Sequence, residues 1–344
     1  MPIDRVVVIG TSSGGVDALR VVVGGLPPHF ATPICVVQHI APHATGILHQ
    51  ILAGAGTLPA SKVVSEMPLR APGVYVAPPD FHLMLEKGAV RISKGPRENR
   101  FRPAIDPLFR SAAYSYGPGA IGVVLTGDLD DGTSGLWAIK ERGGVAIAQD
   151  PAEALYPSMP RSAVQHVAVD HVVPIAAVAP LLVALTAVPI EGGPAIQRLP
   201  ELETEVEIAA GKDARQAGVL RLGQPSKYTC PDCHGVLLEV KDGGVPRFRC
   251  HTGHAYSVES LAAALFQGTE DAMWAAVRAL DEGGMCWSNW RDISKSTMMA
   301  TMPPFSRSAR ARPSAAPTGY DDWQPACPSE HLAVEYGKPR HFAS

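Results

Sequence analysis

The fold of this chain is decided by the stretch Val6-Val7-Val8-Ile9-Gly10-Thr11-Ser12-Ser13-Gly14-Gly15. A β-branched apolar run stops at a glycine, and after two more glycines Val16-Asp17-Ala18-Leu19-Arg20 is typical of the start of a helix. The pattern Gly10-x-Ser12-x-Gly14 matches a nucleophile elbow, in which a serine projects from a sharp turn after a strand. Glycines are suited to this turn because its backbone is strained and the next helix packs closely. The stretch therefore predicts a strand, a tight turn and a helix.

The same turn admits a second interpretation, because Gly10, Gly14 and Gly15 could hold a phosphate group. However, the spacing differs from G-x-G-x-x-G and the lysine of a P-loop is missing. On the turn alone, a nucleophile and a nucleotide-binding turn remain open alternatives.

Composition narrows the class of protein. The chain has 344 residues, a formal net charge of −3 and 46% hydrophobic residues. This length allows one large or two modest domains, and the charge leaves no basic footprint for nucleic acid. We find no apolar run of transmembrane length and no signal-peptide pattern at the N-terminus. Three of the six cysteines are grouped at metal-type spacing, which is typical of a reducing compartment, so we expect a cytoplasmic protein. From the net charge, we expect no nucleic-acid partners.

Strand and helix patterns alternate over the first half of the chain. Apolar strands are predicted at 5–10, 33–38, 120–125 and 145–148, shorter ones at 74–76, 83–85 and 90–92, and helices at 14–24, 46–53, 105–116, 134–142 and 175–185. This alternation predicts the α/β class, with a doubly wound, mostly parallel sheet flanked by helices. We assign it to a catalytic domain over residues 1–187. The acidic run 201–207 and its Gly-Pro-rich flank predict an exposed, solvated linker over 188–226.

Ser12, His39 and Asp131 each follow an apolar strand. The carboxyl ends of parallel strands share one edge of a sheet, so these side chains can converge there. A serine needs a neutral imidazole to take its proton, and the imidazole needs a carboxylate to fix its tautomer. We therefore predict Ser12 as nucleophile, His39 as general base and then acid, and Asp131 as orienting acid. The backbone N–H groups of Ser13 and Gly14 are the candidate oxyanion donors.

Each role has a competing interpretation, and that of His39 is a satisfied histidine at a strand end. Ser13 could replace Ser12 as nucleophile, and Asp128 or Asp130 could replace Asp131. Asp131 could also simply cap the following helix, because aspartate is favoured at that position. The residues of the catalytic edge alone do not decide among these assignments.

A resemblance to a known family favours one assignment. Six motifs occur in the family's order, namely Ile9-Gly10-Thr11-Ser12-Ser13-Gly14-Gly15, Val37-Gln38-His39-Ile40, the run 75–83, the run 102–111, Val124-Leu125-Thr126-Gly127 with Asp131-Gly132, and Ala148-Gln149-Asp150 followed by Met159-Pro160-Arg161. On these motifs, residues 5–186 resemble the catalytic domain of chemotaxis protein-glutamate methylesterases, the CheB family. The resemblance maps the family's triad onto Ser12, His39 and Asp131.

The resemblance implies hydrolysis of glutamate γ-methyl esters with release of methanol, and glutamine deamidation as a second reaction. It implies methylated chemoreceptor-type proteins as substrates, other chemosensory proteins as further partners, and no cofactor for catalysis. An alternative from another class is a signalling adaptor that keeps the fold, binds receptors or partner proteins and has lost useful turnover.

Two departures from the family qualify these expectations. The family usually has Thr-Gly-Met-Gly-x-Asp-Gly where this chain has Thr126-Gly127-Asp128-Leu129-Asp130-Asp131-Gly132. We expect the extra carboxylate of Asp128 to affect turnover or to repel an acidic substrate surface. The family's chemotaxis enzymes also carry a phosphorylated receiver domain ahead of this domain. Because the first strand begins at once, we expect a stand-alone form without control by a phospho-aspartate in the same chain.

A cysteine-containing module is predicted over residues 227–257. Cys230-Pro231-Asp232-Cys233 is followed, after sixteen residues, by Cys250-His251-Thr252-Gly253-His254, which is zinc-ribbon spacing. We predict a structural zinc ion on Cys230, Cys233, Cys250 and His254, with His251 and His234 as competing ligands. A helical segment is expected over 258–283, with Trp274 and Leu280 on its apolar side. The remaining residues, 284–344, lack periodicity and predict a disordered tail.

Overall fold

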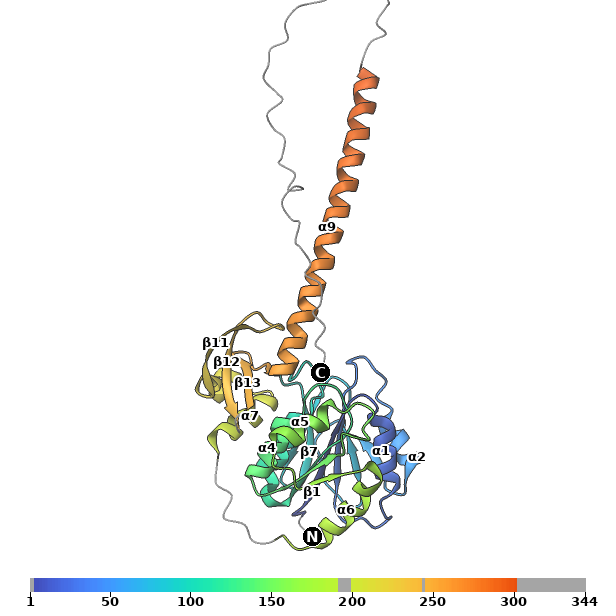
Figure 1. Cartoon of the computed structure of the whole chain (residues 1–344), viewed down its shortest axis with the longest axis vertical. Helices are drawn as coiled ribbons and strands as arrows, with labels where there is room; N and C mark the ends of the chain where they lie inside the picture. The colour runs from blue at the N-terminus through green and yellow to red at the C-terminus, as the bar shows by residue number, and fades with distance from the viewer. Residues whose placement is uncertain (1–2, 191–198, 243–244, 302–344) are drawn as a thin grey trace, which may run out of the picture. The chain divides into compact units, whose positions relative to one another are not determined.

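A parallel sheet forms the centre of residues 3–190, which we call the α/β half of the molecule (Figure 1). The computed structural model describes residues 3–190, 199–242 and 245–301. The sheet has seven strands in the order β10-β9-β8-β1-β2-β5-β3, and each neighbouring pair is parallel. The strands are β1 (Val6–Thr11), β2 (Ile34–Gln38), β3 (Ala60–Lys62), β5 (Val74–Val76), β8 (Ala120–Val124), β9 (Val145–Gln149) and β10 (His171–Val173).

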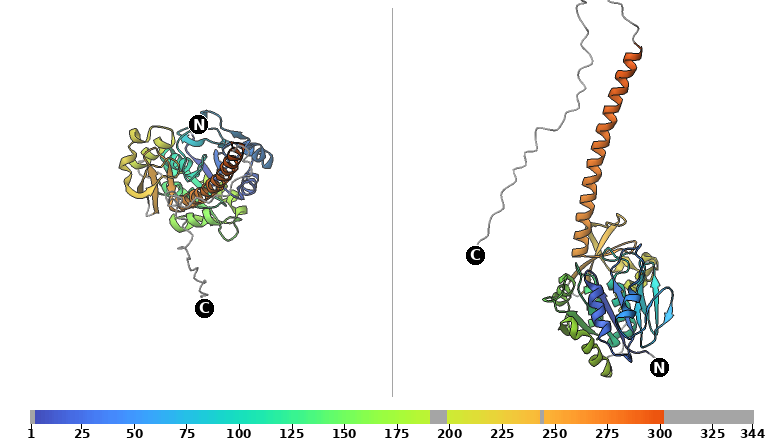
Figure 2. Two further views of the ribbon diagram at one scale, coloured as in Figure 1. Left: turned by 90° about the horizontal axis from the view of Figure 1, so that it is seen from above. Right: turned by 90° about the vertical axis from the view of Figure 1, so that its right-hand side faces the viewer.

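Helices cover both faces of this sheet, as the two side views show (Figure 1, Figure 2). One face packs against α1 (Gly15–Gly24), α2 (Leu48–Ala55) and α6 (Ile175–Ala187). The other packs against α3 (Ile105–Tyr116), α4 (Thr133–Glu141) and α5 (Ser158–His166). The prediction of a doubly wound α/β fold is therefore confirmed. The continuous apolar runs of β1 and β8 follow from burial on both faces.

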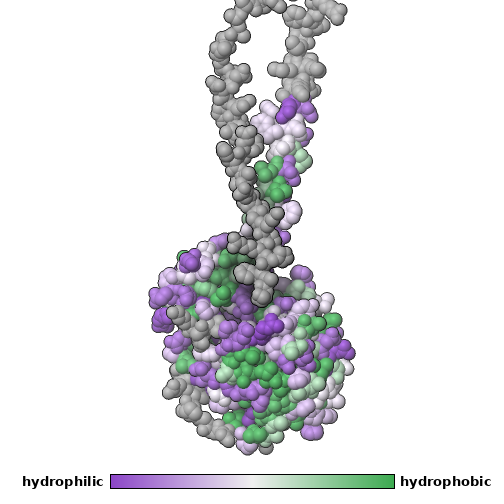
Figure 3. Space-filling view, viewed as in Figure 1, coloured by the Kyte–Doolittle hydropathy of each residue, from purple (hydrophilic) through white to green (hydrophobic). Residues whose placement is uncertain are grey.

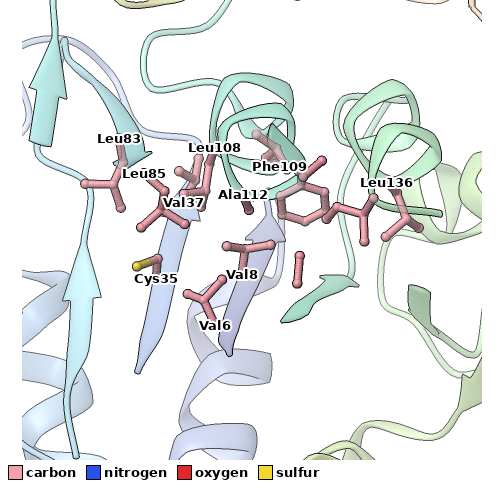
Figure 4. Packing of buried hydrophobic residues seen from close by; sticks show 14 of the residues in the cluster. Val6, Val8, Cys35, Val37, Leu83, Leu85, Leu108, Phe109, Ala112 and Leu136 are labelled. Carbon is pink, nitrogen blue, oxygen red and sulfur yellow. The ribbon is translucent and has the colours of Figure 1, made fainter. Parts of the chain in front are cut away.

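Alternation along the central strands separates the two cores. Val6 and Val8 of β1 point to the same side as Cys35 and Val37 of β2, and there they meet the apolar face of α3 (Figure 4). Val7 and Ile9 point to the opposite core. A small antiparallel sheet of β4 (Met67–Pro68), β6 (His82–Glu86) and β7 (Ala89–Ser93) extends the α3 side.

A second sheet follows in the chain. The antiparallel strands β11 (Gly223–Thr229), β12 (Val236–Asp242), β13 (Val245–Cys250) and β14 (Ala255–Ser257) form what we call the Cys-rich module, residues 223–257. The long helix α9 (Val258–Thr301) begins directly after β14.

The predicted linker over 188–226 is wrong where the structure describes it. Residues 191–198 lie outside the described residues, but α7 (Pro200–Ala209), α8 (Ala214–Ala217) and the 3-10 turn η2 (Val219–Arg221) are ordered elements. Glu205, in the run that we expected to be solvated, is only 3% exposed. It is buried because guanidinium groups surround it: Arg249 donates to it, and Arg110 of α3 lies 3.3 Å away. Glu205 therefore links β13 of the Cys-rich module to α3 of the α/β half.

The predicted disorder from residue 284 is also wrong in part. Helix α9 continues through Gly283 and Gly284 to Thr301, and Figure 2 shows it as one continuous helix. Glycine costs about 1 kcal/mol in a helix interior but does not force a break. Residues 302–344 lie outside the described residues.

The apolar side predicted for the helical segment is not buried. Trp274 and Leu280 are 66% and 77% exposed, and hydrophobic residues lie among hydrophilic ones along α9 (Figure 3). Among the described residues, no helix has both the length and the apolar content needed to cross a bilayer.

We expect Gly10→Ala to lower the free energy of unfolding by about 1–3 kcal/mol, which chemical denaturation would measure. A Cβ atom at this position would lie 2.2 Å from the Cγ2 atom of Ile105, which is fully buried. Gly54→Ala is the matched control, because nothing lies within 4 Å of a Cβ atom there. It should stabilise α2 by about 0.5–1 kcal/mol. Equal effects of the two changes would contradict this packing.

Candidate active site

Ser12 lies in the turn between β1 and α1. Its N–H donates to the carbonyl of Thr126 at 3.0 Å, and its own carbonyl accepts from the N–H of Gly15 at 2.9 Å. Gly14 has φ 74°, a left-handed conformation that glycine adopts without strain. The turn leaves Ser12 9% exposed at the carboxyl edge of the sheet.

His39 follows β2 at the same edge, and its N–H donates to the carbonyl of Thr11 at 3.1 Å. Its Nδ1 atom lies 3.1 Å from Ser12 Oγ, and its Nε2 atom lies 2.7 Å from Asp131 Oδ2. The imidazole stacks on the ring of Phe101, with centroids 3.8 Å apart. In the tautomer with the proton on Nε2, Nδ1 is free to accept the proton of Ser12. The three predicted side chains thus form one hydrogen-bonded chain.

Asp131 is a buried carboxylate surrounded by donors. Besides His39, it accepts hydrogen bonds from Asn99 Nδ2 at 2.8 Å, from the backbone N–H groups of Ile105 at 2.7 Å and Asp106 at 3.3 Å, and from that of Gly132 at 3.0 Å. Burial alone would raise the pKa of Asp131, but the hydrogen bond and charge of His39 and the N–H of Ile105 hold it below its ordinary value. The carboxylate is therefore kept ionised, as a group that orients an imidazole must be.

The competing residues make other contacts. Ser13 Oγ donates to Asp128 Oδ2 at 2.6 Å. Asp130 Oδ1 accepts from Ser257 Oγ at 2.5 Å. Leu129, where the family usually has glycine, is held at φ 62°, which an L residue with a side chain adopts at a cost of about 1–2 kcal/mol. The departures from the family motif therefore lie in the turn that carries Asp131.

The Ser12 side chain opens into a pocket of about 710 Å³. One wall is the turn Ser12–Asp17, and another is the strap Arg97–Arg102. Asp17 and Asp128 give the pocket negative charges, and Arg97 and Arg100 give it positive ones. Arg102, also on the strap, is held by Asp80 at 2.7 Å. The pocket can therefore receive a segment of another protein that carries both polar and charged groups.

Sequence reasoning missed Asn99 and Phe101 on this strap. Glu98 and Phe101 exchange backbone hydrogen bonds of 3.2 Å and 2.9 Å, and the two residues between them, Asn99 and Arg100, have φ 49° and 74°. Positive φ at both central positions is the type I′ turn, for which asparagine is favoured. Asn99 was thus the available signal for a turn, but its contact with Asp131 joins residues far apart in the chain and had no sequence signal.

The Cys-rich module contains a separate cluster. Cys230, Cys233, Cys250 and His254 bring their ligand atoms within 4.8 Å of one another. Cys233 Sγ lies 3.6 Å from Cys250 Sγ, and His254 Nδ1 lies 3.7 Å from Cys230 Sγ. Tetrahedral zinc with bonds of about 2.3 Å to sulfur separates its ligands by about 3.8 Å. The donor set therefore fits a metal ion of this kind and could hold one.

We expect Asp130 to lower the free energy of unfolding of the wild-type chain as the pH rises, and Asp130→Asn to remove this effect. Burial raises the pKa of Asp130 to about 7. The folded chain thus keeps a proton that the unfolded chain releases above about pH 4. The stabilisation is complete below that pH and is lost as the pH rises through about 7. The wild-type free energy of unfolding minus that of the variant should fall by about 2–4 kcal/mol between pH 4 and 8. If urea denaturation gives free energies of unfolding for the two proteins that change with pH in parallel, this expectation is ruled out.

Comparison with known proteins finds relatives that match the region containing Ser12, His39 and Asp131. A sequence profile of the family described as CheB methylesterase matches residues 7–182. An Anaeromyxobacter dehalogenans protein, named protein-glutamate methylesterase/protein-glutamine glutaminase 2, is 47% identical over 171 residues, which are 50% of this chain and 50% of that protein. A Leptospira interrogans protein whose name carries the same two activities is 40% identical over 180 residues, 52% of this chain and 93% of its own length.

A solved structure agrees with this match. The Thermotoga maritima CheB methylesterase catalytic domain aligns with a TM-score of 0.51 and 34% identity, over 53% of this chain and 98% of that domain. The matching region spans about half the length of several curated relatives, the Anaeromyxobacter protein among them. Through residues 7–182, the chain belongs to the CheB methylesterase family.

Proposed function

We propose that this chain is a protein-glutamate methylesterase that hydrolyses glutamate γ-methyl esters with a Ser12, His39 and Asp131 triad. The observation that carries the proposal is the hydrogen-bonded chain from Ser12 Oγ through His39 to Asp131, at 3.1 Å and 2.7 Å. Ser12 and His39 line the pocket, and all three residues lie in the half of the chain that matches the family.

The first half of the reaction forms an acyl-enzyme. Ser12 Oγ attacks the ester carbonyl carbon while Nδ1 of His39 takes the hydroxyl proton. The carbonyl oxygen becomes an oxyanion, and the backbone N–H groups of Ser13 and Gly14, at the N-terminal end of α1, are the proposed donors to it. When the intermediate collapses, the carbon–methoxy bond breaks and the imidazolium gives its proton to the leaving oxygen. Methanol is released, and Asp131 stabilises the imidazolium in between.

The second half regenerates the enzyme. Water attacks the acyl carbon and gives a proton to His39. The bond to Ser12 then breaks, Ser12 Oγ regains a proton from the imidazole, and the glutamate leaves as a carboxylate with a proton released to solvent. Glutamine deamidation follows the same steps with ammonia as the leaving group, and we propose it as a second reaction. Neither half requires a cofactor.

The substrates that we propose are methylated chemoreceptor-type proteins in the cytoplasm. The names of the relatives and the family match support this class of substrate. Arg97 and Arg100 on the strap offer positive charge to an acidic protein surface, whereas Asp128 offers the opposite charge. We propose that this mixture of charges selects among receptors. Other chemosensory proteins are the further partners that we propose.

We also propose that Cys230, Cys233, Cys250 and His254 hold a structural zinc ion. With four protein ligands the ion would have no open position, and its role would be to stabilise the fold of the Cys-rich module. The matching spacing of the ligand atoms and the sulfur-rich donor set support zinc.

We expect Ser12→Ala to lower methanol release from methylated receptor membranes by ~10⁴-fold or more, because the nucleophile is lost. Ser65→Ala, on an exposed loop, is the matched control and should release methanol at the wild-type rate. Peptide mapping after reaction with a fluorophosphonate probe should find the label on Ser12. Unchanged release from the Ser12 variant would refute the esterase, and an unlabelled wild type would favour a signalling adaptor.

Elemental analysis should find about one zinc ion per chain. Cys233→Ser should lose most of it, because one of the four ligands is weakened, and the thermal midpoint should fall. Cys286→Ser is the control, since Cys286 is an exposed residue of α9. Purified wild-type chain without zinc would contradict the metal assignment and leave the esterase untouched.

A further inference from the structure

The side-chain amide of Asn99 joins the catalytic acid to the Cys-rich module. On one side its Nδ2 atom donates to Asp131 Oδ1 at 2.8 Å and to Asp106 Oδ2 at 3.0 Å. On the other side its Oδ1 atom accepts from the N–H of Ser257 at 2.8 Å and from Ser260 Oγ at 3.0 Å. Asn99 is 4% exposed, so these four contacts replace its hydration.

The chemistry of these neighbours allows one orientation of the amide. An ionised carboxylate only accepts hydrogen bonds, so the NH₂ group must face Asp131. A backbone N–H only donates, so the carbonyl oxygen must face Ser257. Turning the amide over would place its oxygen against the carboxylates and its NH₂ group against a donor. The carboxylate of Asp131 and the backbone N–H of Ser257 therefore determine which end of Asn99 meets the catalytic acid, and Ser260 Oγ supplies a second donor to the carbonyl oxygen.

The two serines are themselves held by the start of α9. Ser257 Oγ accepts from the N–H of Ser260 at 3.0 Å, and the N–H of Ser257 lies 2.9 Å from Ser260 Oγ. This reciprocal pair is a capping box, with serine in place of the usual glutamate. Since each hydroxyl has one proton, Ser260 can give its proton to Asn99 while Ser257 gives its own to Asp130.

Backbone contacts add to this connection. The N–H of Asn99 donates to the carbonyl of Ala255 in β14 at 2.8 Å, and the N–H of Ala255 donates to the carbonyl of Arg97 at 3.2 Å. Glu98 accepts from Arg249 of β13 at 2.9 Å. The strap that stacks Phe101 on His39 is thus paired with the Cys-rich module at Arg97–Asn99.

We propose that Asn99 is a positioning residue for Asp131 and that Ser257 and Ser260 hold it in place, so that the end of the Cys-rich module and the start of α9 complete the active site. The proposal rests on the esterase function above. Without the Ser260 hydroxyl, the carbonyl oxygen of Asn99 keeps only one of its two donors, the amide is held less firmly, and the hydrogen bond of Asp131 to His39 is less well directed. The chemical step slows, whereas the pocket that binds substrate is unchanged.

The test compares kcat and KM for methanol release from methylated receptor membranes by the full-length chain. Asn99→Gly keeps the left-handed backbone without strain and removes the amide. We expect kcat to fall about 10–100-fold, the usual cost of losing a supporting hydrogen bond at an active site, with KM within about twofold. Ser260→Ala should lower kcat by about 3–10-fold. Ser226→Ala, which changes a serine of the Cys-rich module away from Asn99, is the matched control and should keep the wild-type kcat.

A double-mutant cycle separates positioning from general stability. If Ser260 acts through Asn99, adding Ser260→Ala to Asn99→Gly should cause no further loss of kcat. Additive losses would overturn the proposal, as would a wild-type kcat in Ser260→Ala. If thermal melting shows that Ser260→Ala does not fold, Asn99→Asp is measured in its place. Aspartate keeps an acceptor for the serines but turns a carboxylate oxygen, in place of the NH₂ group, toward Asp131. A wild-type kcat in that variant would equally overturn the proposal. An inactive wild type would instead refute the esterase.

Discussion

The structure depends on keeping one buried carboxylate, that of Asp131, ionised and correctly directed. Burial of a charge is costly unless donors compensate it, and here the donors come from four separate parts of the chain. His39 follows β2, Ile105 opens α3, Gly132 precedes α4, and Asn99 lies on the strap. The packing of the parallel sheet against α3 and the pairing of the strap with the Cys-rich module therefore serve the same group.

A buried network of charges connects the strap, α3 and α7 with β13 of the Cys-rich module. Arg110 of α3 contacts Glu98 and Glu205, and Arg249 of β13 contacts the same two carboxylates. Burial would raise the pKa of Glu205, but the surrounding arginines, Arg247 and Arg249 foremost, hold it below its ordinary value. Removing one partner of such a network leaves an uncompensated charge, which is strongly destabilising. Through this network, buried charged residues connect the Cys-rich module to α3 and to the strap.

The fold was predictable because its signals are local. The apolar runs of β1 and β8 and the glycines around Ser12 indicate strand, turn and helix without knowledge of the rest. Ser12, His39 and Asp131 could be proposed as a set because each follows such a run at one sheet edge. Asn99 and Phe101 could not be, because their roles depend on contacts with residues distant in sequence. Glu205 was misjudged for the same reason, since an acidic run looks solvated until its arginine partners, from α3 and β13, are known.

The central claim is that Ser12 and His39 form a working catalytic pair under the control of Asp131. The most direct measurement is a crystal structure of the full-length chain after reaction with a fluorophosphonate. The account predicts a phosphorus atom bonded to Ser12 Oγ, with a phosphoryl oxygen about 3 Å from the backbone N–H of Ser13. It also predicts that His39 remains hydrogen-bonded to Asp131. An adduct on another residue, or a phosphoryl oxygen directed away from the start of α1, would contradict it.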